Sequence, residues 1–260
     1  MSVIRTTLAA LALCTLGATA AMAQSADAAT TPTQGQILLV VTNHDVMGDT
    51  GKPTGYWMAE VSHAWCVFTD AGYAVTFASP KGGIAPADPR SFDLSDADNK
   101  RMWSQRSVIE ALADTRPLTG VDPADYKAVY FAGGHGTMWD FPDSAALQKV
   151  TAAIYEQGGV VSAVCHGPAA LVNVKLSDGK YLVDGKSVTG FTNDEEDAAG
   201  LTQAVPFLLE SKLKERGGQV TVAENFKPHV VQADRLLTGQ NPASSRPLAE
   251  AVVQRLSEQP

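Results

Sequence analysis

The sequence contains little cysteine, no excess of basic residues and no CxxC pair. Its three cysteines in 260 residues exclude a disulfide-stapled scaffold, and the missing CxxC pair excludes a zinc ribbon. The formal net charge of −8 argues against a nucleic-acid or anionic-membrane surface. Apolar residues are abundant at 45% of the chain, which suits a globular core and excludes a disordered chain.

The first 23 residues differ in character from the rest of the chain. A single charge, Arg5, precedes a short apolar run that cannot span a bilayer, and Ala-Met-Ala follows at 21–23. This order is typical of a cleaved secretory signal peptide over 1–23, with a buried N-terminal helix as the alternative. Residues 24–35 are rich in Ala, Thr, Ser and Gly and predict a flexible linker. We therefore expect a periplasmic or secreted protein.

The remaining residues, 36–257, alternate between strand and helix patterns. Strands buried on both faces read as continuous apolar runs. Such runs occur at 36–42, 73–78, 128–132 and 160–164. Helices are predicted between them at 54–72, closed by Gly72, and at 146–157. This alternation predicts one α/β domain with a mostly parallel sheet and helices on both faces.

Two later stretches do not follow this alternation of strand and helix patterns. Residues 82–117 are rich in Pro, Asp and Gly and predict an insertion of loops and small helices, which we expect to supply the walls of a substrate pocket. Asp-Gly at 184–185, between apolar runs, predicts a β-hairpin. The C-terminal part predicts a helix at 205–216, strands at 220–223 and 230–237, and a helix at 242–256 capped by Asn241.

Cys165 is the strongest candidate for chemistry. It follows a predicted buried strand and precedes His166, Gly167 and Pro168. A residue at such a strand-to-helix turn lies at the carboxyl edge of the sheet, as in a nucleophile elbow. The N-terminus of the following helix is expected to lower the pKa of the thiol. The alternative interpretation is an inert buried cysteine.

A glycine-rich loop follows the third predicted strand. Gly133 and Gly134 precede His135, and glycines let the backbone approach a ligand and present N–H groups. In a cysteine enzyme, an oxyanion hole is built at such a loop. A tight turn between a strand and a helix is the alternative, and His135 is expected to be a structural hydrogen-bonding residue rather than a base.

Glu60 lies in the first predicted helix, at the border of the apolar stripe that carries Trp57 and Ala64. Partial burial there is expected to raise its pKa and to make it a proton partner for a thiol. A salt-bridged residue at the rim is the alternative. Cys66 faces away from this border, so we do not expect a disulfide between Cys66 and Cys165, although an oxidising compartment would permit one.

An acidic cluster follows the predicted hairpin at 193–197. A Cys–His pair needs a third group to orient the imidazole, and this cluster can supply it. Most of the cluster is expected to be solvated helix surface, so the pattern alone does not select one member.

Taken together, these motifs resemble the PfpI, class I glutamine amidotransferase-like superfamily. Within it, the chain is similar to the branch of heat-inducible chaperones and glutathione-independent glyoxalases (glyoxalase III). The segments that carry the resemblance are TGYWMAE at 54–60, ASPKGG at 78–83, AGGHGTMWDFP at 132–142, VCHGPAAL at 164–171, GKSVTGFTNDEE at 185–196 and LTGQNPASS at 237–245. The implied fold is a flavodoxin-like sandwich with a nucleophile elbow after a central strand.

The resemblance also implies roles for matching residues. Cys165 would be the nucleophile, His166 its proton shuttle, and Glu60 a hydrogen-bonding partner of the sulfur. Glu196 would orient the histidine, with Glu195 as the alternative in case of a register error. The implied oxyanion donors are the backbone N–H groups of Gly133, Gly134 and His166.

The implied activity is a cysteine-dependent lyase (D-lactate dehydratase) that converts methylglyoxal to lactate through a hemithioacetal, with no cofactor and no metal. The implied partners are a small 2-oxoaldehyde and a second copy in a homodimer, but neither nucleic acid nor, after signal cleavage, a membrane.

Five other functions stay open. They are a holdase chaperone that binds unfolded proteins, an amidase, isonitrile hydratase or peptidase using the same thiol, and a redox sensor, because an exported thiol meets oxidants. Glutaminase chemistry is disfavoured, because the superfamily's downstream His-x-Glu pair is missing and His229 is followed by Val-Val.

Overall fold

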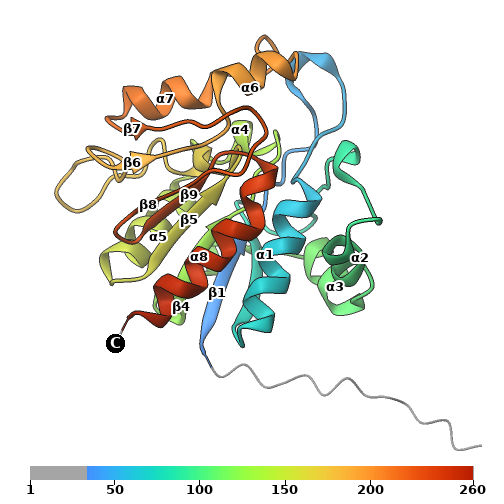
Figure 1. The fold of residues 1–260 in the computed structure, drawn as a ribbon. Coiled ribbons are helices and arrows are strands. Elements are labelled where there is room, and N and C mark those ends of the chain that lie inside the picture. Colours follow the sequence, from blue (N-terminus) through green and yellow to red (C-terminus); the bar gives the residue numbers. More distant parts are fainter. Residues whose placement is uncertain (1–33, 260) are drawn as a thin grey trace, which may run out of the picture. The chain divides into compact units, whose positions relative to one another are not determined.

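The computed structural model describes residues 34–259, which fall within one unit of the chain (Figure 1). The predicted signal peptide and nearly all of the predicted linker lie outside these residues. Within the described part of the chain, no helix combines the length and the apolar character needed to cross a membrane.

A seven-stranded sheet forms the centre of this unit, in the order β3-β2-β1-β4-β5-β9-β8. All neighbouring pairs are parallel except β8 and β9. The strands are β1 (Gln36–Val40), β2 (Ala74–Ser79), β3 (Arg116–Pro117), β4 (Tyr126–Phe131), β5 (Val160–Val164), β8 (Val230–Ala233) and β9 (Leu236–Gly239). The central order β2-β1-β4-β5-β9 is that of a flavodoxin-like sheet, which confirms the predicted fold class.

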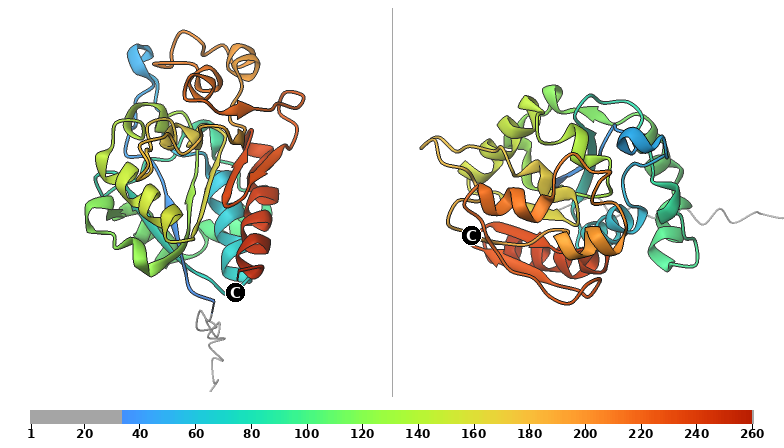
Figure 2. Two further views of the ribbon diagram at one scale, coloured as in Figure 1. Left: turned by 90° about the vertical axis from the view of Figure 1, so that its left-hand side faces the viewer. Right: turned by 90° about the horizontal axis from the view of Figure 1, so that it is seen from above.

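Helices cover both faces of the sheet (Figure 2). On one face, α1 (Met58–Asp70) packs against α8 (Ser245–Ser257), and α2 (Ala97–Trp103) lies beside α1. On the other face, α5 (Ala145–Glu156) contacts β4 and β5. The remaining helices are α3 (Arg106–Ala113), α4 (Thr137–Asp140), α6 (Asn193–Ala198) and α7 (Leu209–Glu215). Figure 1 shows α6 and α7 above the carboxyl ends of the strands.

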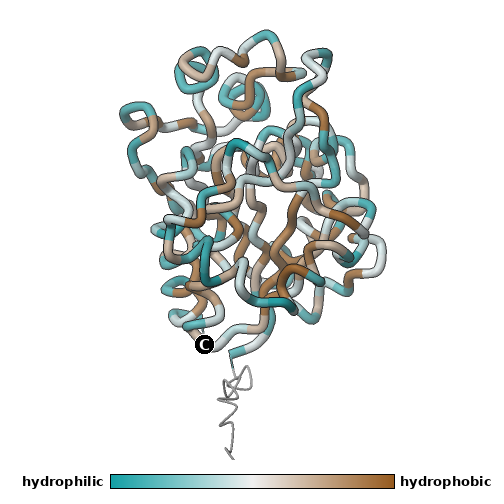
Figure 3. The backbone as a smooth tube through the Cα atoms, turned by 90° about the vertical axis from the view of Figure 1, so that its right-hand side faces the viewer, coloured by the Kyte–Doolittle hydropathy of each residue, from teal (hydrophilic) through white to brown (hydrophobic). Residues whose placement is uncertain are grey.

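The apolar runs that predicted strands form the core between these layers. All five residues of β5 are buried, and four of the five in β1 are buried. In Figure 3 the hydrophobic stretches follow the central strands, whereas hydrophilic stretches gather on the outer loops. The strand order reverses between β1 and β4, and open α/β sheets bind their ligands outside the carboxyl ends of the strands at such a point.

The predicted hairpin at 184–185 is wrong. Residues 182–185 form turns, and β6 (Ser187–Val188) pairs with β7 (Gln219–Val220) in a parallel two-stranded sheet. An Asp-Gly pair permits a tight turn, but the strand that leaves it pairs with a partner distant in sequence. The expected 220–223 strand is correspondingly short.

The C-terminal part also differs from prediction. The expected strand at 230–237 is two antiparallel strands, β8 and β9, which turn at Asp234 with φ of 57°. The expected helix at 205–216 begins only at Leu209. The final helix begins with a 3-10 turn at Pro242–Ser244, and Asn241 makes no side-chain capping bond to it. Its amide instead donates to Glu195 and to the Lys227 carbonyl.

Candidate active site

The strand β5 ends in a sharp elbow at Cys165. The residue has φ of 59°, a left-handed conformation that is strained for a side chain other than glycine. Two backbone hydrogen bonds fix it: the Cys165 N–H donates to the Gly239 carbonyl (2.9 Å), and its carbonyl accepts from Phe191 (2.8 Å). The elbow therefore presents the thiol at the carboxyl edge of the sheet, as the sequence predicted.

A line of hydrogen bonds joins the thiol to a buried carboxylate. His166 Nδ1 lies 3.3 Å from Cys165 Sγ, and His166 Nε2 lies 2.7 Å from Glu196 Oε2. A carboxylate only accepts, so Nε2 carries the proton and the lone pair of Nδ1 faces the thiol. Burial opposes the ionisation of Glu196, but His166 and His135 outweigh it and hold the pKa of Glu196 below its usual range. His166 is thus oriented to accept the thiol proton.

His135 holds the second oxygen of the same carboxylate. Its Nε2 lies 2.9 Å from Glu196 Oε1, and its Nδ1 lies 3.3 Å from Arg90 Nη2. Burial and the neighbouring His166 lower the pKa of His135 to about 4, so the ring is neutral at pH 7. The expectation that His135 is a hydrogen-bonding residue agrees with this geometry.

Arg90 continues the chain of hydrogen bonds from His135, away from the thiol. Its guanidinium pairs with the Asp88 carboxylate in a two-pronged contact, Nη2–Oδ2 at 2.6 Å and Nε–Oδ1 at 3.0 Å. Sequence reasoning missed both residues. The available signal was an Asp-Pro-Arg tripeptide at 88–90, in which Asp88 caps a 3-10 turn (Pro89–Ser91), and such a pattern is common without any role in a site.

Glu60 lies below the thiol, fully buried on α1. Its Oε2 accepts the N–H of Gly133 at 2.6 Å, Oε1 makes no hydrogen bond to a nitrogen or oxygen, and the side chain interacts with the sulfur of Cys165. Burial raises the pKa of Glu60 to about 8, as the sequence predicted in direction, so the carboxyl group keeps its proton at pH 7. The protonated carboxyl group can then donate to the sulfur.

The expected lowering of the pKa of Cys165 is wrong. Burial raises it well above the usual value, and an ionised Glu60 carboxylate raises it further. The predicted helix after the elbow is one 3-10 turn, Gly167–Ala170, too short to build a strong dipole, and the thiol is only 2% exposed. The resting group is a thiol, and His166 is placed to deprotonate it.

The predicted set of oxyanion donors needs one correction. The Gly133 N–H is already donated to Glu60, so it does not face a reacting oxygen. Gly134, with φ of 95°, lines the pocket, and the His166 N–H points at the Cys165 sulfur. A Cβ at Gly133 would lie 2.7 Å from Glu60 Oε2 and from the His166 nitrogen, which explains the need for glycine there.

The thiol opens into a small pocket of about 180 Å³. The lining residues are mostly apolar or aromatic: Trp57, Arg90, Gly134, His135, Cys165, His166, Phe191, Ala199, Phe226 and Pro242. The expectation that segment 82–117 supplies the walls is wrong except for Arg90. The walls come from loops distant in sequence, and hydrophobic periodicity does not predict where such loops meet.

Glu195 and Glu196 are both buried but serve different partners. Glu195 forms a capping box with Thr192 at the start of α6, and its Oε1 accepts from the Asn241 side chain at 2.8 Å. Its carboxylate makes no contact with His166, so the structure brings Glu196, and not Glu195, to the histidine. Asp194 and Asp197 are exposed, as expected for the rest of the cluster.

The two cysteines of the described residues are free and lie apart. Cys66 is buried in α1, where burial and Asp98 raise the pKa of its thiol to about 12. It does not line the pocket, in agreement with the expectation from its helical position.

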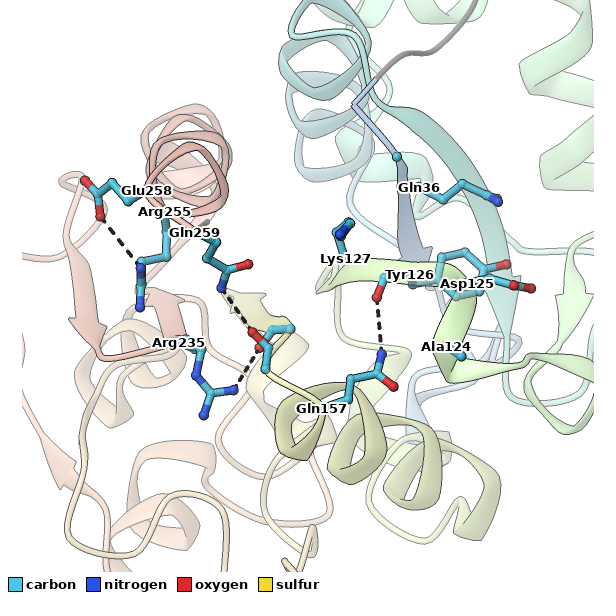
Figure 4. A pocket seen from close by; sticks show the side chains of 13 residues that line it. Gln36, Ala124, Asp125, Tyr126, Lys127, Gln157, Arg235, Arg255, Glu258 and Gln259 are labelled. Atoms are coloured by element: carbon cyan, nitrogen blue, oxygen red, sulfur yellow. Dashed lines mark hydrogen bonds and ion pairs between the residues drawn. The ribbon is translucent and has the colours of Figure 1, made fainter.

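A second, larger cleft of about 680 Å³ lies at the opposite edge of the sheet, where β1 and β4 begin (Figure 4). Several of its polar groups are engaged with one another. Gln259 Nε2 donates to the Gly158 carbonyl at 3.0 Å, and Arg255 pairs with Glu258 at 3.8 Å. The nucleophile and its partners are all at the other edge.

Among residues 34–259, two groups of side chains bring possible metal-ligating atoms within 4.8 Å of one another. They are His135, His166 and Glu196 in the buried site, and His63, Asp96 and Asp98 between α1 and α2. In the first group, both Nε2 atoms face Glu196 and are accounted for by the hydrogen bonds described above.

Comparison with known proteins connects this chain to a family. The model of the DJ-1/PfpI family matches residues 54–255. The chain is similar to Glyoxalase 3 of Candida albicans, with 33% identity over 84% of this chain and 97% of the relative. It is also similar to the glutathione-independent glyoxalase HSP31 of Saccharomyces cerevisiae, with 31% identity over 82% of this chain and 94% of the relative.

A solved structure extends the likeness to three dimensions. The Rapid Encystment Protein 24 KDa of Francisella tularensis superposes with a TM-score of 0.83 at 38% identity. The match covers 85% of this chain and 99% of the other.

Proposed function

Because the chain belongs to the DJ-1/PfpI family, we propose that it is a glutathione-independent glyoxalase that converts methylglyoxal to lactate with Cys165 as nucleophile. The observation that carries the proposal is the line from Cys165 Sγ through His166 to Glu196, at 3.3 Å and 2.7 Å, in a pocket of about 180 Å³. The names of the relatives from Candida albicans and Saccharomyces cerevisiae support the same activity.

The first step joins the thiol to the aldehyde carbon. His166 Nδ1 accepts the proton of the thiol while the S–C bond forms, and the aldehyde oxygen then takes that proton to give a hemithioacetal. Glu196 balances the positive charge that His166 carries in between, because Oε2 lies 2.7 Å from the protonated Nε2. The buried ion pair exists only during proton transfer, which is when it stabilises the reacting state.

The second step moves a proton between two carbons. His166 removes the proton from the carbon bound to sulfur, and the electron pair forms an enediolate with the adjacent carbonyl. The N–H group of Gly134 is the available donor to its oxygens, and the N–H of His166 joins it once the sulfur is bonded to the substrate. Return of the proton to the second carbon gives a lactoyl thioester, and water releases lactate and regenerates the thiol. Methylglyoxal and water are consumed and lactate is formed, with no external oxidant.

The test is lactate formation from methylglyoxal by the full chain, without glutathione and with excess chelator. Cys165→Ala and Glu196→Gln are compared with Cys66→Ala, which removes the other buried thiol of the described residues. We expect turnover in the unmodified protein and in Cys66→Ala, and its loss in Cys165→Ala. Turnover that persists in Cys165→Ala contradicts the proposed nucleophile, and turnover that needs added metal contradicts the metal-free reaction.

A further inference from the structure

One wall of the pocket belongs to a loop that no part of the proposed chemistry uses. This loop, residues 221–229, which we call the rim segment, connects β7 to β8. Phe226 lies within it and lines the pocket, with its ring 6.2 Å from that of Phe191. Half of Phe226 is exposed, so its ring separates the pocket from solvent.

The backbone of the rim segment is held in a strained conformation. Phe226 has φ of 60°, a left-handed value that is a genuine outlier for a bulky residue. Such a conformation persists only where the surroundings determine it, and it concentrates at functional sites. The strain marks Phe226 as a residue whose position is fixed by other parts of the fold.

The fixing group is Glu195, which is fully buried. Its Oε1 accepts the Phe226 N–H at 2.7 Å, the Gln240 amide at 3.0 Å and the Asn241 amide at 2.8 Å. Asn241 also donates to the Lys227 carbonyl at 2.8 Å, one residue beyond Phe226. A single carboxylate thus ties the rim segment to the end of β9 and to the start of α6.

The interior of the pocket favours a flat, uncharged group. Three aromatic side chains, Trp57, Phe191 and Phe226, contribute to its walls, and aromatic rings gain from contact with another ring. Arg90 is the one lysine or arginine among the residues that line it, and Asp88 already pairs with its guanidinium. The walls therefore offer no uncompensated cation to a substrate carboxylate.

The volume sets an upper limit on the substrate. About 180 Å³ is below the roughly 300–1,000 Å³ of sites for drug-sized ligands. A 2-oxoaldehyde with one phenyl ring is smaller than such drug-sized ligands, and it would place its ring against the aromatic walls of the pocket.

We propose that Phe226 is a specificity-determining residue that makes the site favour aryl 2-oxoaldehydes over methylglyoxal, and that Glu195 is the positioning residue that holds it. The preference among aldehydes rests on the proposed glyoxalase function. The position of Phe226 in the wall of the thiol's pocket does not rest on that function. A second measurement therefore distinguishes failure of the aryl preference from failure of the glyoxalase function.

The first measurement is kcat/KM for phenylglyoxal and for methylglyoxal. We expect the unmodified protein to favour phenylglyoxal, and Phe226→Ala to lower the phenylglyoxal-to-methylglyoxal ratio by about tenfold. The matched control is Val222→Ala, an exposed residue of the same segment that does not line the pocket, and it should leave the ratio unchanged. An equal ratio in the unmodified protein and Phe226→Ala overturns the proposal.

Glu195→Gln tests the positioning role. The amide keeps the size of the side chain but cannot accept at both oxygens, so the rim segment loses part of its anchor. We expect Glu195→Gln to lower the phenylglyoxal-to-methylglyoxal ratio, as Phe226→Ala does. The value of kcat/KM for methylglyoxal should change less than the value for phenylglyoxal. A uniform loss for both substrates would mean that Glu195 supports the fold and does not position Phe226.

The second measurement does not need turnover. Cys165 is alkylated with 2-bromoacetophenone or with iodoacetamide, bromide or iodide leaves as the S–C bond forms, and mass spectrometry follows the modified peptide. Phe226→Ala should slow the aryl reagent relative to iodoacetamide by several-fold, whereas Val222→Ala should not. If neither aldehyde is turned over but this selectivity appears, the glyoxalase function fails and the aryl-binding wall stands. Equal selectivity in all three proteins overturns the proposal.

Discussion

Two clusters of the described residues combine imidazole and carboxylate groups in very different surroundings. His135, His166 and Glu196 lie under the pocket, with side chains between 1% and 7% exposed. His63, Asp96 and Asp98 lie between α1 and α2, with side chains between 18% and 32% exposed. Each cluster holds imidazole and carboxylate groups at hydrogen-bonding distance.

The difference lies in what satisfies each carboxylate. Asp96 caps α2 by accepting the N–H groups of Asp98 and Asn99, both at 2.9 Å, and Arg246 pairs with Asp98. Glu196 receives only the two imidazoles, one of which faces a thiol. A partly exposed carboxylate with ordinary partners stabilises a helix, whereas a desolvated one that depends on an imidazole can control a proton. The presence of imidazole and carboxylate groups alone does not distinguish the two clusters.

Removing the carboxylate from each cluster should separate them most clearly. Glu196→Gln replaces an acceptor by a group that can donate to His166 Nε2, so the imidazole takes the wrong tautomer and Nδ1 no longer accepts the thiol proton. We expect kcat to fall by about a thousandfold or more. Asp96→Asn should change it by less than about twofold, because Asp96 touches no reacting group.

These two variants are compared by steady-state lactate formation, with circular dichroism to confirm folding. A folded Glu196→Gln protein with near-normal turnover would refute the role of the buried cluster and leave no functional difference between the two.

The proton on Glu60 predicts a pH limit that the exposed cluster cannot produce. As pH rises through about 8, Glu60 ionises and raises the pKa of Cys165 further, so activity should decline on the alkaline side. Glu60→Gln keeps a donor toward the sulfur and an acceptor for Gly133, and it should remove this decline while keeping activity at pH 7 within about tenfold. The measurement is kcat/KM from pH 6 to 10. An unchanged alkaline limit in Glu60→Gln contradicts the assignment.

The same group affects stability with a defined sign. The pKa of Glu60 is raised from about 4.3 in the unfolded chain to about 8 in the fold. The folded state therefore binds more protons between these values, and the unfolding free energy decreases as pH rises through this window. Urea denaturation at several pH values should show a shallower decrease in Glu60→Gln.

A third change weakens the buried cluster without removing its carboxylate. Arg90→Met leaves Asp88 without its guanidinium and His135 Nδ1 without its donor, but both hydrogen bonds to Glu196 remain possible. We expect kcat/KM to fall by about tenfold, less than for Glu196→Gln. Arg101→Met is the matched control, because this arginine pairs with Asp70 on the surface and should not change activity. Equal effects of the two arginines would remove Arg90 from the site.

The sequence predicted the parts of this contrast that depend on local patterns. Continuous apolar runs identify β1, β4 and β5, because burial on both faces leaves no polar alternation, and the elbow at Cys165 follows from the strand that ends there. The border position of Glu60 on α1 predicts its raised pKa. These inferences need only the neighbours along the chain.

The parts that failed depend on pairing across long separations. The partner of β6 is β7, about thirty residues later, so the Asp-Gly signal at 184–185 could not reveal it. The Gly133 N–H is diverted to Glu60, which lies 73 residues earlier. The pKa of Cys165 depends on full burial, and Arg90 and Phe226 reach the pocket from separate loops. Helical periodicity and motif spacing carry no information on such contacts between segments that are distant in the sequence.

The smallest expected effect belongs to the exposed cluster and concerns stability alone. Asp96→Ala removes the acceptor of two N–H groups at the start of α2, which should lower the unfolding free energy by about 1 kcal/mol at pH 7.

The contribution of Asp96 to stability should also depend on pH. Burial opposes ionisation of Asp96, but the N–H bonds and His63 outweigh it and lower its pKa. The contribution is therefore present above the unfolded pKa of about 3.9 and is lost as pH falls. Urea denaturation at pH 7 and pH 3 checks both statements, with Glu110→Ala, an exposed partner of Arg106, as the near-neutral control. If Asp96→Ala instead reduced kcat/KM at unchanged stability, the exposed cluster would be coupled to the site and the contrast between the two clusters would fail.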